Sequence, residues 1–271
     1  MPTVRGLLNE ISGQLSSAGI ADSALESRMM LCFVLDTDTA GLLRIYDEPA
    51  AKELTDRSFD MLKRRMSGEP LQYILGRWEF MGLPFIIRPC ALIPRADTET
   101  LAEHAIGLIK KRSYRTVLDI CCGSGCIGIS IAKFTGAAVT AADVDEKCAA
   151  LTQENAELNG ISVRTAVSDM FGRIEQAFDI IVCNPPYIPS GEIPFLQREV
   201  LFEPVRALSG GHDGLDYYRM LYKEAPSHIR KGGVLLMEAG AGQADDIKKI
   251  FQGGYSVKDI CGIERVIVVQ Y

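Results

Sequence analysis

The chain of 271 residues carries 29 basic and 35 acidic side chains, and 47% of its residues are hydrophobic. These proportions exclude a disordered tail, a collagen-like fibre and a small disulfide scaffold. At roughly 150 residues per domain the length favours two domains, and the net charge of -6 disfavours non-specific binding to nucleic acid.

The first part of the chain is expected to be helical. Apolar residues recur there at helical spacing, as in Leu7, Ile11 and Leu15, and no strand pattern is visible. We therefore predict a small all-helical domain over residues 1–72. Short extended pieces separated by glycine and proline follow, and they predict a β-hairpin linker over residues 73–95.

The remainder, residues 96–271, alternates between buried strands and helices. This alternation is typical of βαβ units, so we predict an α/β fold with a seven-stranded, mostly parallel sheet. A first helix runs through Leu101 and Ile109. The expected strands are 116–120, 138–142, 163–167, 178–183, 234–238, 256–260 and 266–270, and the other expected helices lie near 126–134, 145–159, 215–230 and 243–251.

The location of the protein is inferred from its apolar segments and cysteines. No apolar stretch approaches the roughly 20 residues that cross a membrane, and the first residues lack a signal-peptide pattern. The eight cysteines do not show the paired C-x-x-C spacing of a zinc site, so we expect free thiols and no bound metal. We predict a cytoplasmic protein that does not interact with membranes.

A glycine-rich turn follows the first strand of the predicted sheet. Gly123, Gly125 and Gly128 satisfy the G-x-G-x-x-G spacing, which places a nucleotide at a helix N-terminus. Asp143 ends the second strand, where an acid that binds a ribose is expected. The alternative is that the glycines only tighten a turn and that Asp143 caps a helix; the joint pattern favours a nucleotide.

Asp119 indicates which nucleotide. Its carboxylate, expected to point into the crevice, would repel the pyrophosphate of a dinucleotide but attract a cofactor with a positive end. S-adenosylmethionine carries an ammonium and a sulfonium, so it is favoured over NAD. Asp169, after the third strand, is placed either to accept a hydrogen bond from the adenine amino group or to cap a helix.

The fourth strand ends in Asn184-Pro185-Pro186-Tyr187. Open α/β sheets bind ligands at the carboxyl ends of their strands, so this segment is expected to face the cofactor. The two prolines remove two amide donors, which leaves the carboxamide oxygen of Asn184 and the carbonyl of Pro185 as acceptors. Together with the Tyr187 ring they would form a site for a planar NH2 group.

The chemistry of such a site suits methyl transfer to nitrogen. An amide or exocyclic amine nitrogen is a poor nucleophile because its lone pair is delocalised. Fixed acceptors for both N–H groups favour the charge that builds up on nitrogen as it attacks, and they hold it in line with the methyl group. A dedicated general base is not required before the attack, and the sequence shows none.

With these motifs, the chain resembles class I S-adenosylmethionine-dependent methyltransferases, and within them the HemK/PrmC glutamine methyltransferases. The resemblance covers nearly the whole chain. Beyond the glycine turn and the Asn-Pro-Pro-Tyr segment, it rests on Pro70 to Gly76, Glu79-Phe80, Leu92 to Arg95 with Asp97-Thr98-Glu99, Glu203-Pro204, Ala207-Leu208, Asp213 to Leu215, and Gly232-Gly233 to Glu238 with Gly240 and Gln243.

The resemblance implies a Rossmann-like methyltransferase sheet and a helical domain that grips a protein substrate. The implied reaction moves a methyl group from S-adenosylmethionine to the side-chain N5 of the glutamine in the Gly-Gly-Gln loop of peptide chain release factors, which modulates translation termination and leaves S-adenosylhomocysteine. The positions that match the family's cofactor residues are Cys121, Cys122, Gly123, Ser124, Gly125, Asp143, Met170 and Asn184, and those that match its substrate residues are Asn184, Pro185, Pro186 and Tyr187.

Two positions depart from the family pattern. Cys121 stands where the turn usually has its first glycine, and Met170 stands where a tryptophan usually covers the adenine. Both changes concern cofactor affinity more than the type of reaction.

Other functions remain as alternatives. A DNA adenine N6-methyltransferase uses the same Asn-Pro-Pro-Tyr chemistry, but the acidic composition and the helical first domain argue against it, so we expect no direct binding of nucleic acid. A non-catalytic module that only binds the cofactor is disfavoured by the intact Asn184 segment.

Overall fold

The computed structural model describes residues 2–271, which divide into two compact units. One comprises the residues up to Gly76 together with Arg198–Phe202, and the other comprises Arg77–Gln197 and Glu203–Tyr271. The second piece of the first unit is far away in the sequence, and no sequence pattern indicated that it belongs there. No helix among residues 2–271 is both long and apolar enough to cross a membrane.

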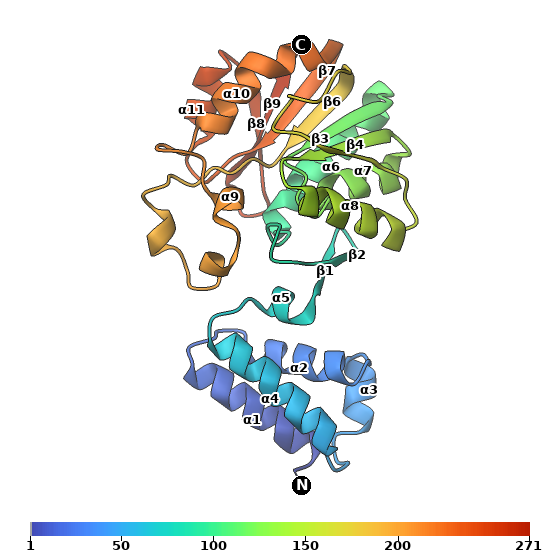
Figure 1. The fold of residues 1–271 in the computed structure, drawn as a ribbon, viewed down its shortest axis with the longest axis vertical. Helices are drawn as coiled ribbons and strands as arrows, with labels where there is room; N and C mark the ends of the chain where they lie inside the picture. The colour runs from blue at the N-terminus through green and yellow to red at the C-terminus, as the bar shows by residue number, and fades with distance from the viewer. Residues whose placement is uncertain (1) are drawn as a thin grey trace. The chain divides into compact units, whose positions relative to one another are not determined.

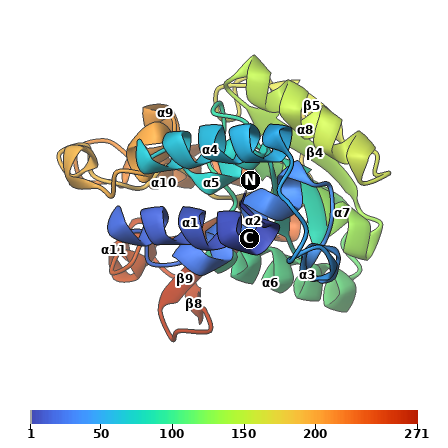
Figure 2. The same cartoon turned by 90° about the horizontal axis from the view of Figure 1, so that it is seen from below.

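The first unit is built from helices α1 to α5 (Figure 1). Helices α1, α2 and α4 pack against one another, and Figure 2 shows α1 and α4 from below. Their shared core contains Leu7, Ile11 and Leu15, the apolar stripe of the first helix, all fully buried. The bounds are α1 Val4–Ser17, α2 Ser23–Val34, α3 Thr39–Arg44, α4 Lys52–Met66 and α5 Leu71–Leu75.

One charged side chain is buried in this unit. Arg65 of α4 is 3% exposed, and its guanidinium donates to Glu26 at 2.6 Å and to Glu199 at 2.5 Å. An unpaired buried charge is costly, and Glu26 of α2 and Glu199 of the distant segment both pair with this guanidinium. The ion pair with Glu199 ties Arg198–Phe202 to the helical unit.

The second unit is an α/β domain that begins with the hairpin β1–β2. Its main sheet has seven strands in the order β5-β4-β3-β6-β7-β9-β8, with β9 antiparallel to both of its neighbours. This confirms the predicted α/β fold with a mostly parallel seven-stranded sheet. The strands are β1 Arg77–Phe80, β2 Leu83–Ile86, β3 Thr116–Ile120, β4 Ala138–Asp143, β5 Arg164–Val167, β6 Phe178–Cys183, β7 Ile229–Glu238, β8 Tyr255–Lys258 and β9 Glu264–Gln270.

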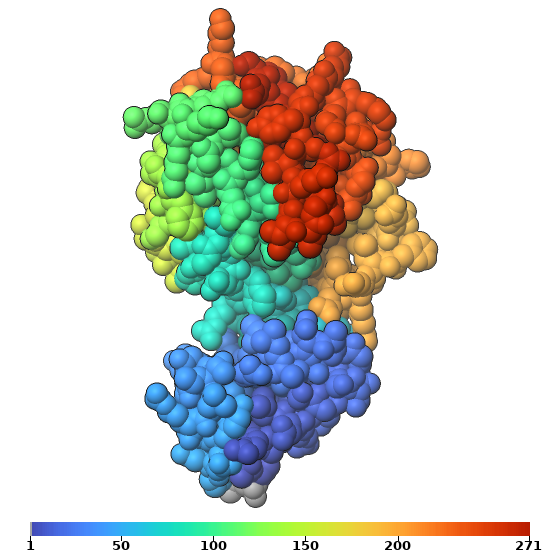
Figure 3. Space-filling model, turned by 180° about the vertical axis from the view of Figure 1, so that it is seen from behind, coloured from blue at the N-terminus to red at the C-terminus, as the bar shows by residue number. Residues whose placement is uncertain are grey.

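Helices cover both faces of the sheet. Tyr218 and Leu221 of α10 and Ile247 of α11 join one apolar core with strand residues such as Ile181 and Leu235. Helix α6 packs on β6, β7 and β9, and Figure 3 shows its green surface beside the red C-terminal strands. The helices are α6 Ala96–Arg112, α7 Cys126–Thr135, α8 Glu146–Leu158, α9 Val205–Leu208, α10 Asp216–Glu224 and α11 Ala244–Ile250, with 3-10 turns η1 Ile193–Phe195, η2 Val200–Phe202 and η3 Ala225–His228.

One expected helix is wrong in its extent. The prediction of a helix over 215–230 is correct only to Glu224, after which a 3-10 turn leads into β7 from Ile229. Pro226 lies in this turn, and a proline ring disfavours continuation of the preceding helix. Strand β7 is accordingly longer than the expected 234–238.

Candidate active site

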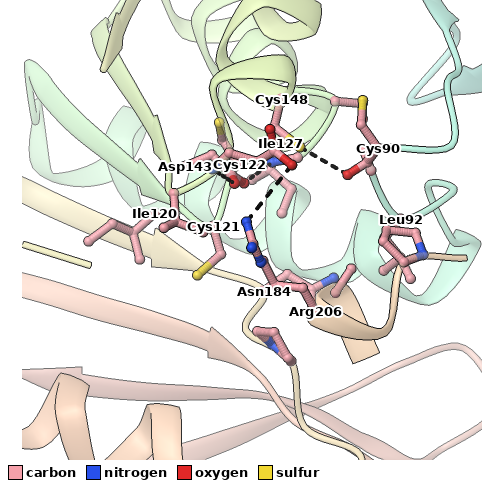
Figure 4. Close-up of a pocket in the computed structure, with 18 of the residues that line it drawn as sticks. Cys90, Leu92, Ile120, Cys121, Cys122, Ile127, Asp143, Cys148, Asn184 and Arg206 are labelled. Carbon is pink, nitrogen blue, oxygen red and sulfur yellow. Dashed lines mark hydrogen bonds and ion pairs between the residues drawn. The ribbon is translucent and has the colours of Figure 1, made fainter. Parts of the chain in front are cut away.

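A cavity of about 400 Å³ lies at the carboxyl ends of β3, β4 and β6. This is the edge of an open α/β sheet where ligands bind. Figure 4 shows Asn184 reaching from the segment after β6 toward the turn that contains Cys121 and Cys122. The expected site residues that line the cavity are Cys121, Cys122, Gly123, Ser124, Asp143, Asp169, Met170, Asn184 and Pro186, whereas Asp119, Gly125, Pro185 and Tyr187 do not.

The glycine turn is closed by Asp143. Its Oδ2 accepts a hydrogen bond from the Gly123 amide at 2.9 Å, and its Oδ1 accepts from the Asp145 amide at 3.0 Å. Burial raises the pKa of this carboxyl above its ordinary value. The two amide donors lower the pKa, but their effect is smaller than that of burial. The carboxylate is thus fixed at the edge of the cavity with capacity to accept a further hydrogen bond.

Gly125 has a structural reason for being glycine. It adopts φ +79° as the residue before α7, and a Cβ there would lie 2.6 Å from Thr152 Cγ2. Both the backbone conformation and the lack of space disfavour any side chain. Gly125 therefore shapes the turn without lining the cavity.

Asp119 does not face the cavity, contrary to expectation. Its side chain is fully buried beneath the turn, and its Oδ2 accepts from the Gly128 amide at 2.8 Å. The first turn of a helix has amide groups without intrahelical partners, and the carboxylate satisfies one of them. Asp119 thus holds the start of α7 rather than presenting charge to a ligand.

The burial of Asp119 predicts a dependence of stability on pH. Burial raises the pKa of this carboxyl from 3.8 to about 7, so the folded protein holds a proton that the unfolded chain releases. Stability is therefore full below the pKa of the unfolded chain and is lost as pH rises toward 7. For cofactor-free protein we expect the free energy of unfolding in urea to fall by a few kcal/mol, in order of magnitude, across this window.

The control for this prediction is Asp119→Asn, which retains an acceptor for the Gly128 amide but does not titrate. We expect this variant to lose a substantial part of the pH dependence. Parallel stability curves for the wild-type protein and the variant would contradict the assignment to Asp119.

The two departures from the family pattern lie against each other. The sulfur atoms of Cys121 and Met170 are 3.9 Å apart, and both residues have a positive φ, +59° and +43°. Residues other than glycine adopt this conformation at some energetic cost. The left-handed backbone at Cys121 explains why glycine is the expected residue there, and Met170 fills the adjoining space with a flexible thioether.

The other cysteines near the cavity are packing residues. All eight cysteines are free, and burial raises the pKa of the Cys126 thiol to about 12 and that of Cys122 well above its ordinary value. Neither is a reactive thiolate near neutral pH. Among residues 2–271, no group of three or more His, Cys, Asp or Glu side chains is placed to hold a metal ion.

Asn184 is held in place by a helix that sequence reasoning did not connect with it. Its Nδ2 donates to the hydroxyl oxygen of Thr98 in α6 at 3.4 Å, and Thr98 also lines the cavity. With the amide nitrogen engaged in this way, Oδ1 is the part of the carboxamide left to accept from a ligand.

Tyr187 does not line the cavity. Its hydroxyl donates to Glu238 Oε1 at 3.4 Å, and its carbonyl accepts from Gln243 Nε2 at 2.9 Å. The expected contact of the Tyr187 ring with a substrate therefore stays a prediction. Glu238 is the acid that ends an otherwise apolar strand, Val234 to Glu238, and this was the available signal for its importance.

Gly210 is a further residue that the sequence did not single out. A Cβ at this position would lie 2.7 Å from Gly214 O, 2.8 Å from Pro186 O and 2.8 Å from Tyr187 Cα. All three are backbone atoms, which cannot move aside as a side chain does. Only glycine lets residues 208–210 lie this close to the Asn-Pro-Pro-Tyr segment.

Gly210→Ala is therefore expected to displace that segment. Because small misplacements of reacting groups are costly, we expect kcat for methyl transfer to fall about 10- to 100-fold. Gly107→Ala is the matched control, since Gly107 lies exposed in α6 with no atom within 4 Å of its Cβ position. Equal rates for the two variants would show that the close approach at Gly210 is irrelevant to catalysis.

Two family models match: a PrmC N-terminal domain over residues 6–76 and a methyltransferase small domain over residues 98–212. The release factor glutamine methyltransferase of Geobacter sulfurreducens is 39% identical over 273 residues, covering 98% of this chain and 95% of that protein. The chain belongs to the release factor glutamine methyltransferase family. The family member from Fusobacterium nucleatum is 37% identical over 275 residues, covering 97% of this chain and 78% of that protein.

Solved structures of other methyltransferases share the fold of this family member over most of its chain. A methyltransferase from Pyrococcus furiosus superposes with a TM-score of 0.53 at 20% identity, over 70% of this chain and 90% of that one. A 16S rRNA methyltransferase from T. thermophilus, in complex with AdoMet and guanosine, superposes with a TM-score of 0.52 at 18% identity, over 72% of this chain and 49% of that one. These likenesses confirm the predicted Rossmann-like methyltransferase fold.

Proposed function

We propose that this chain transfers a methyl group from S-adenosylmethionine to the side-chain N5 of the glutamine in the Gly-Gly-Gln loop of peptide chain release factors. The observation that carries the proposal is the place of Asn184. It lines the same cavity as the glycine turn and Asp143, and two prolines without amide donors follow it. The names of the relatives, which cover nearly the whole chain, support glutamine as the target.

The residues around the cavity fit S-adenosylmethionine. Asp143 is a fixed acceptor for ribose hydroxyls, and the exposed Asp169 carboxylate on the rim could accept from the adenine amino group. The backbone of Cys121 to Gly125 lies along the turn that leads into α7, and Met170 is buried beside it. Asp119 contributes indirectly, because it holds the turn through Gly128.

The bound cofactor supplies an electrophilic methyl group on a sulfonium. Asn184 Oδ1 accepts a hydrogen bond from the target NH2 group, and we assign the second acceptor to the Pro185 carbonyl. Together they would orient the nitrogen lone pair toward the methyl group and stabilise the positive charge that develops on nitrogen, which is lost when the methylated nitrogen releases one N–H proton to solvent. Pro186 contributes a wall of the cavity without an amide donor that would compete for these acceptors.

The first unit is proposed to bind the body of the release factor. It belongs to the PrmC N-terminal domain family over residues 6–76, and none of its residues from position 2 onward lines the 400 Å³ cavity. We also propose that residues 1–72, 73–95 and 96–271 act as the substrate-binding domain, the hairpin linker and the methyltransferase domain. Location in the cytoplasm and the lack of direct binding to nucleic acid or membranes stay predictions.

The test uses labelled S-adenosylmethionine with purified release factor, with release factor whose loop glutamine is replaced by alanine, and with duplex DNA. We expect label on the first substrate alone, on the loop glutamine. Label on DNA but not on release factor would overturn the proposal in favour of an adenine methyltransferase. Equal labelling of the release factor that carries alanine in place of its loop glutamine would place the methyl group on another residue.

A further inference from the structure

Glu238 is a buried acid directly behind the Asn-Pro-Pro-Tyr segment. It ends β7, its residue is 2% exposed, and its backbone carbonyl accepts from the Tyr218 hydroxyl at 2.7 Å. Its carboxylate accepts from the Tyr187 hydroxyl at 3.4 Å, while Oε2 has no hydrogen-bond partner among residues 2–271. A buried carboxylate oxygen without a partner is costly, so this acid calls for an explanation beyond packing.

A second hydroxyl lies near both Glu238 and Asn184. Thr98 belongs to α6, which packs on β7, and its side chain lowers the pKa of the Glu238 carboxyl at the end of that strand. The Thr98 oxygen accepts from Asn184 Nδ2 at 3.4 Å. A hydroxyl carries a single proton. If Thr98 directs that proton to Glu238, its oxygen can only accept from Asn184, and the amide nitrogen of Asn184 must then face Thr98.

The orientation of the Asn184 carboxamide matters because its two ends are chemically opposite. Oδ1 accepts hydrogen bonds and Nδ2 donates them, although the two have nearly the same shape. A target NH2 group needs an acceptor. With Nδ2 turned to Thr98, Oδ1 faces the cavity, whereas the flipped amide would place a donor against a donor.

We propose that Glu238 is a positioning residue for methyl transfer: through the Thr98 hydroxyl it sets the orientation of the Asn184 carboxamide so that Oδ1 faces the substrate nitrogen. The consequence for catalysis rests on the proposed function. The orientation itself is a property of the protein alone.

In the proposed relay from Glu238 through Thr98 to Asn184, the charge on Glu238 sets the direction of the Thr98 proton. The Oε2 of charged Glu238, unpartnered among residues 2–271, attracts that proton. Protonated Glu238 would instead donate to Thr98, whose own proton is then free to bond Asn184 Oδ1 and favour the flipped amide. Burial raises the pKa of Glu238 to about 7, so both states occur near neutral pH. The groups that face it are Thr98 and Asp97 of α6, Arg265 of β9, Tyr187, Tyr218 and Cys126.

Of these groups, Thr98, Arg265 and Tyr187 lower the pKa of Glu238 and Asp97 raises it. Asp97 and Arg265 also form an ion pair with each other at 2.8 Å, so their opposite effects on the pKa of Glu238 come from one pair of charges. The remaining neighbours are neutral over the range that matters, because burial raises the pKa of the Cys126 thiol to about 12 and that of the Tyr218 hydroxyl well above its ordinary value. Glu238 is thus the group of this cluster expected to change charge near neutrality.

The direct test follows the side-chain amide of Asn184 by NMR in protein made with isotope-labelled asparagine and studied without substrate. The chain has only four asparagines, and the resonance lost in Asn184→Ala identifies the right one. We expect this resonance to shift with pH through a midpoint near neutrality in the wild-type protein and to stay unmoved in Glu238→Gln. Glu103→Gln, an exposed change on α6, should titrate as the wild type does.

A kinetic test separates positioning from folding. Thr98→Ser retains the hydroxyl and should keep kcat near that of the wild type, whereas Thr98→Val should lower kcat about 10-fold or more with little change in cofactor affinity. In the wild type, kcat should rise with pH as Glu238 loses its proton. In Glu238→Gln this rise should be absent. Thermal unfolding confirms that each variant is folded, and the threonine pair decides the matter if Glu238→Gln does not fold.

An unchanged titration of the Asn184 amide in Glu238→Gln would overturn the inference, as would equal kcat values for the two Thr98 variants. Failure of the proposed function is a separate result. It would appear as absence of label on the release factor with wild-type protein, and the amide titration would still support or overturn the role of Glu238.

Discussion

Asn184→Ala is expected to reduce kcat for release factor methylation by about 100- to 1,000-fold, the loss typical when one fixed transition-state hydrogen bond is removed. Asn184 Oδ1 is the side-chain acceptor that we assign to the target NH2 group, and alanine leaves that group without a partner. Cofactor binding should weaken much less, because Asp143 and the glycine turn are untouched. Single-turnover rates with labelled cofactor, together with calorimetric binding of S-adenosylhomocysteine, measure the two effects separately.

The conservative variant sharpens this test. Asn184→Asp keeps an acceptor oxygen in the cavity and replaces the amide that donates to Thr98 with a second, charged acceptor oxygen, so it should retain more activity than Asn184→Ala. Full activity in Asn184→Ala would remove Asn184 from the mechanism. A loss of cofactor affinity as large as the loss of kcat would make it a cofactor residue instead.

Asp143→Ala should weaken the binding of S-adenosylmethionine by about 10- to 100-fold, which is the cost of losing hydrogen bonds to a charged acceptor. The carboxylate has two roles that alanine removes together: it accepts from Gly123 and Asp145, and it offers an acceptor to the ribose. We expect the apparent KM for the cofactor to rise, with a smaller change in kcat at saturation. Calorimetry with S-adenosylhomocysteine gives the affinity directly.

Asp143→Asn distinguishes charge from geometry. The asparagine can still accept from one amide but lacks the second acceptor oxygen, so its affinity should lie between those of wild type and Asp143→Ala. Glu157→Ala, on the exposed side of α8, is the matched control and should bind the cofactor as the wild type does. Wild-type affinity in Asp143→Ala would show that the ribose binds elsewhere.

Much of the site was visible in the sequence because parallel sheets impose a simple rule. The carboxyl ends of β3, β4 and β6 meet at one edge, so the residues that follow them, such as Gly123, Asp143 and Asn184, had to converge. Strand alternation and helical spacing likewise predicted the α/β class, because they reflect which face of each element is buried.

The direction of individual side chains was less predictable. Asp119 was expected to face the cavity, yet it lies beneath the turn. The buried Gly128 amide has no partner within its own helix, and the Asp119 carboxylate is its hydrogen-bond acceptor. The Tyr187 hydroxyl donates to Glu238, a contact that no pattern in the sequence indicated. Such choices depend on which unsatisfied group lies nearest in space, and spacing along the chain does not contain that information.

The sequence by itself determined the chemistry and the family: an acidic two-part chain with a glycine turn and an Asn-Pro-Pro-Tyr segment, placed by periodicity on a parallel sheet. Only the tertiary structure decided how Asn184 is oriented, since Thr98, whose hydroxyl oxygen accepts from Asn184 Nδ2, is 86 residues away from it in the chain. It also decided that Gly210 must lack a side chain and that Arg198–Phe202 joins the helical unit. These features arise from contacts between distant segments, whose partners are selected by packing and by the need to satisfy buried polar groups.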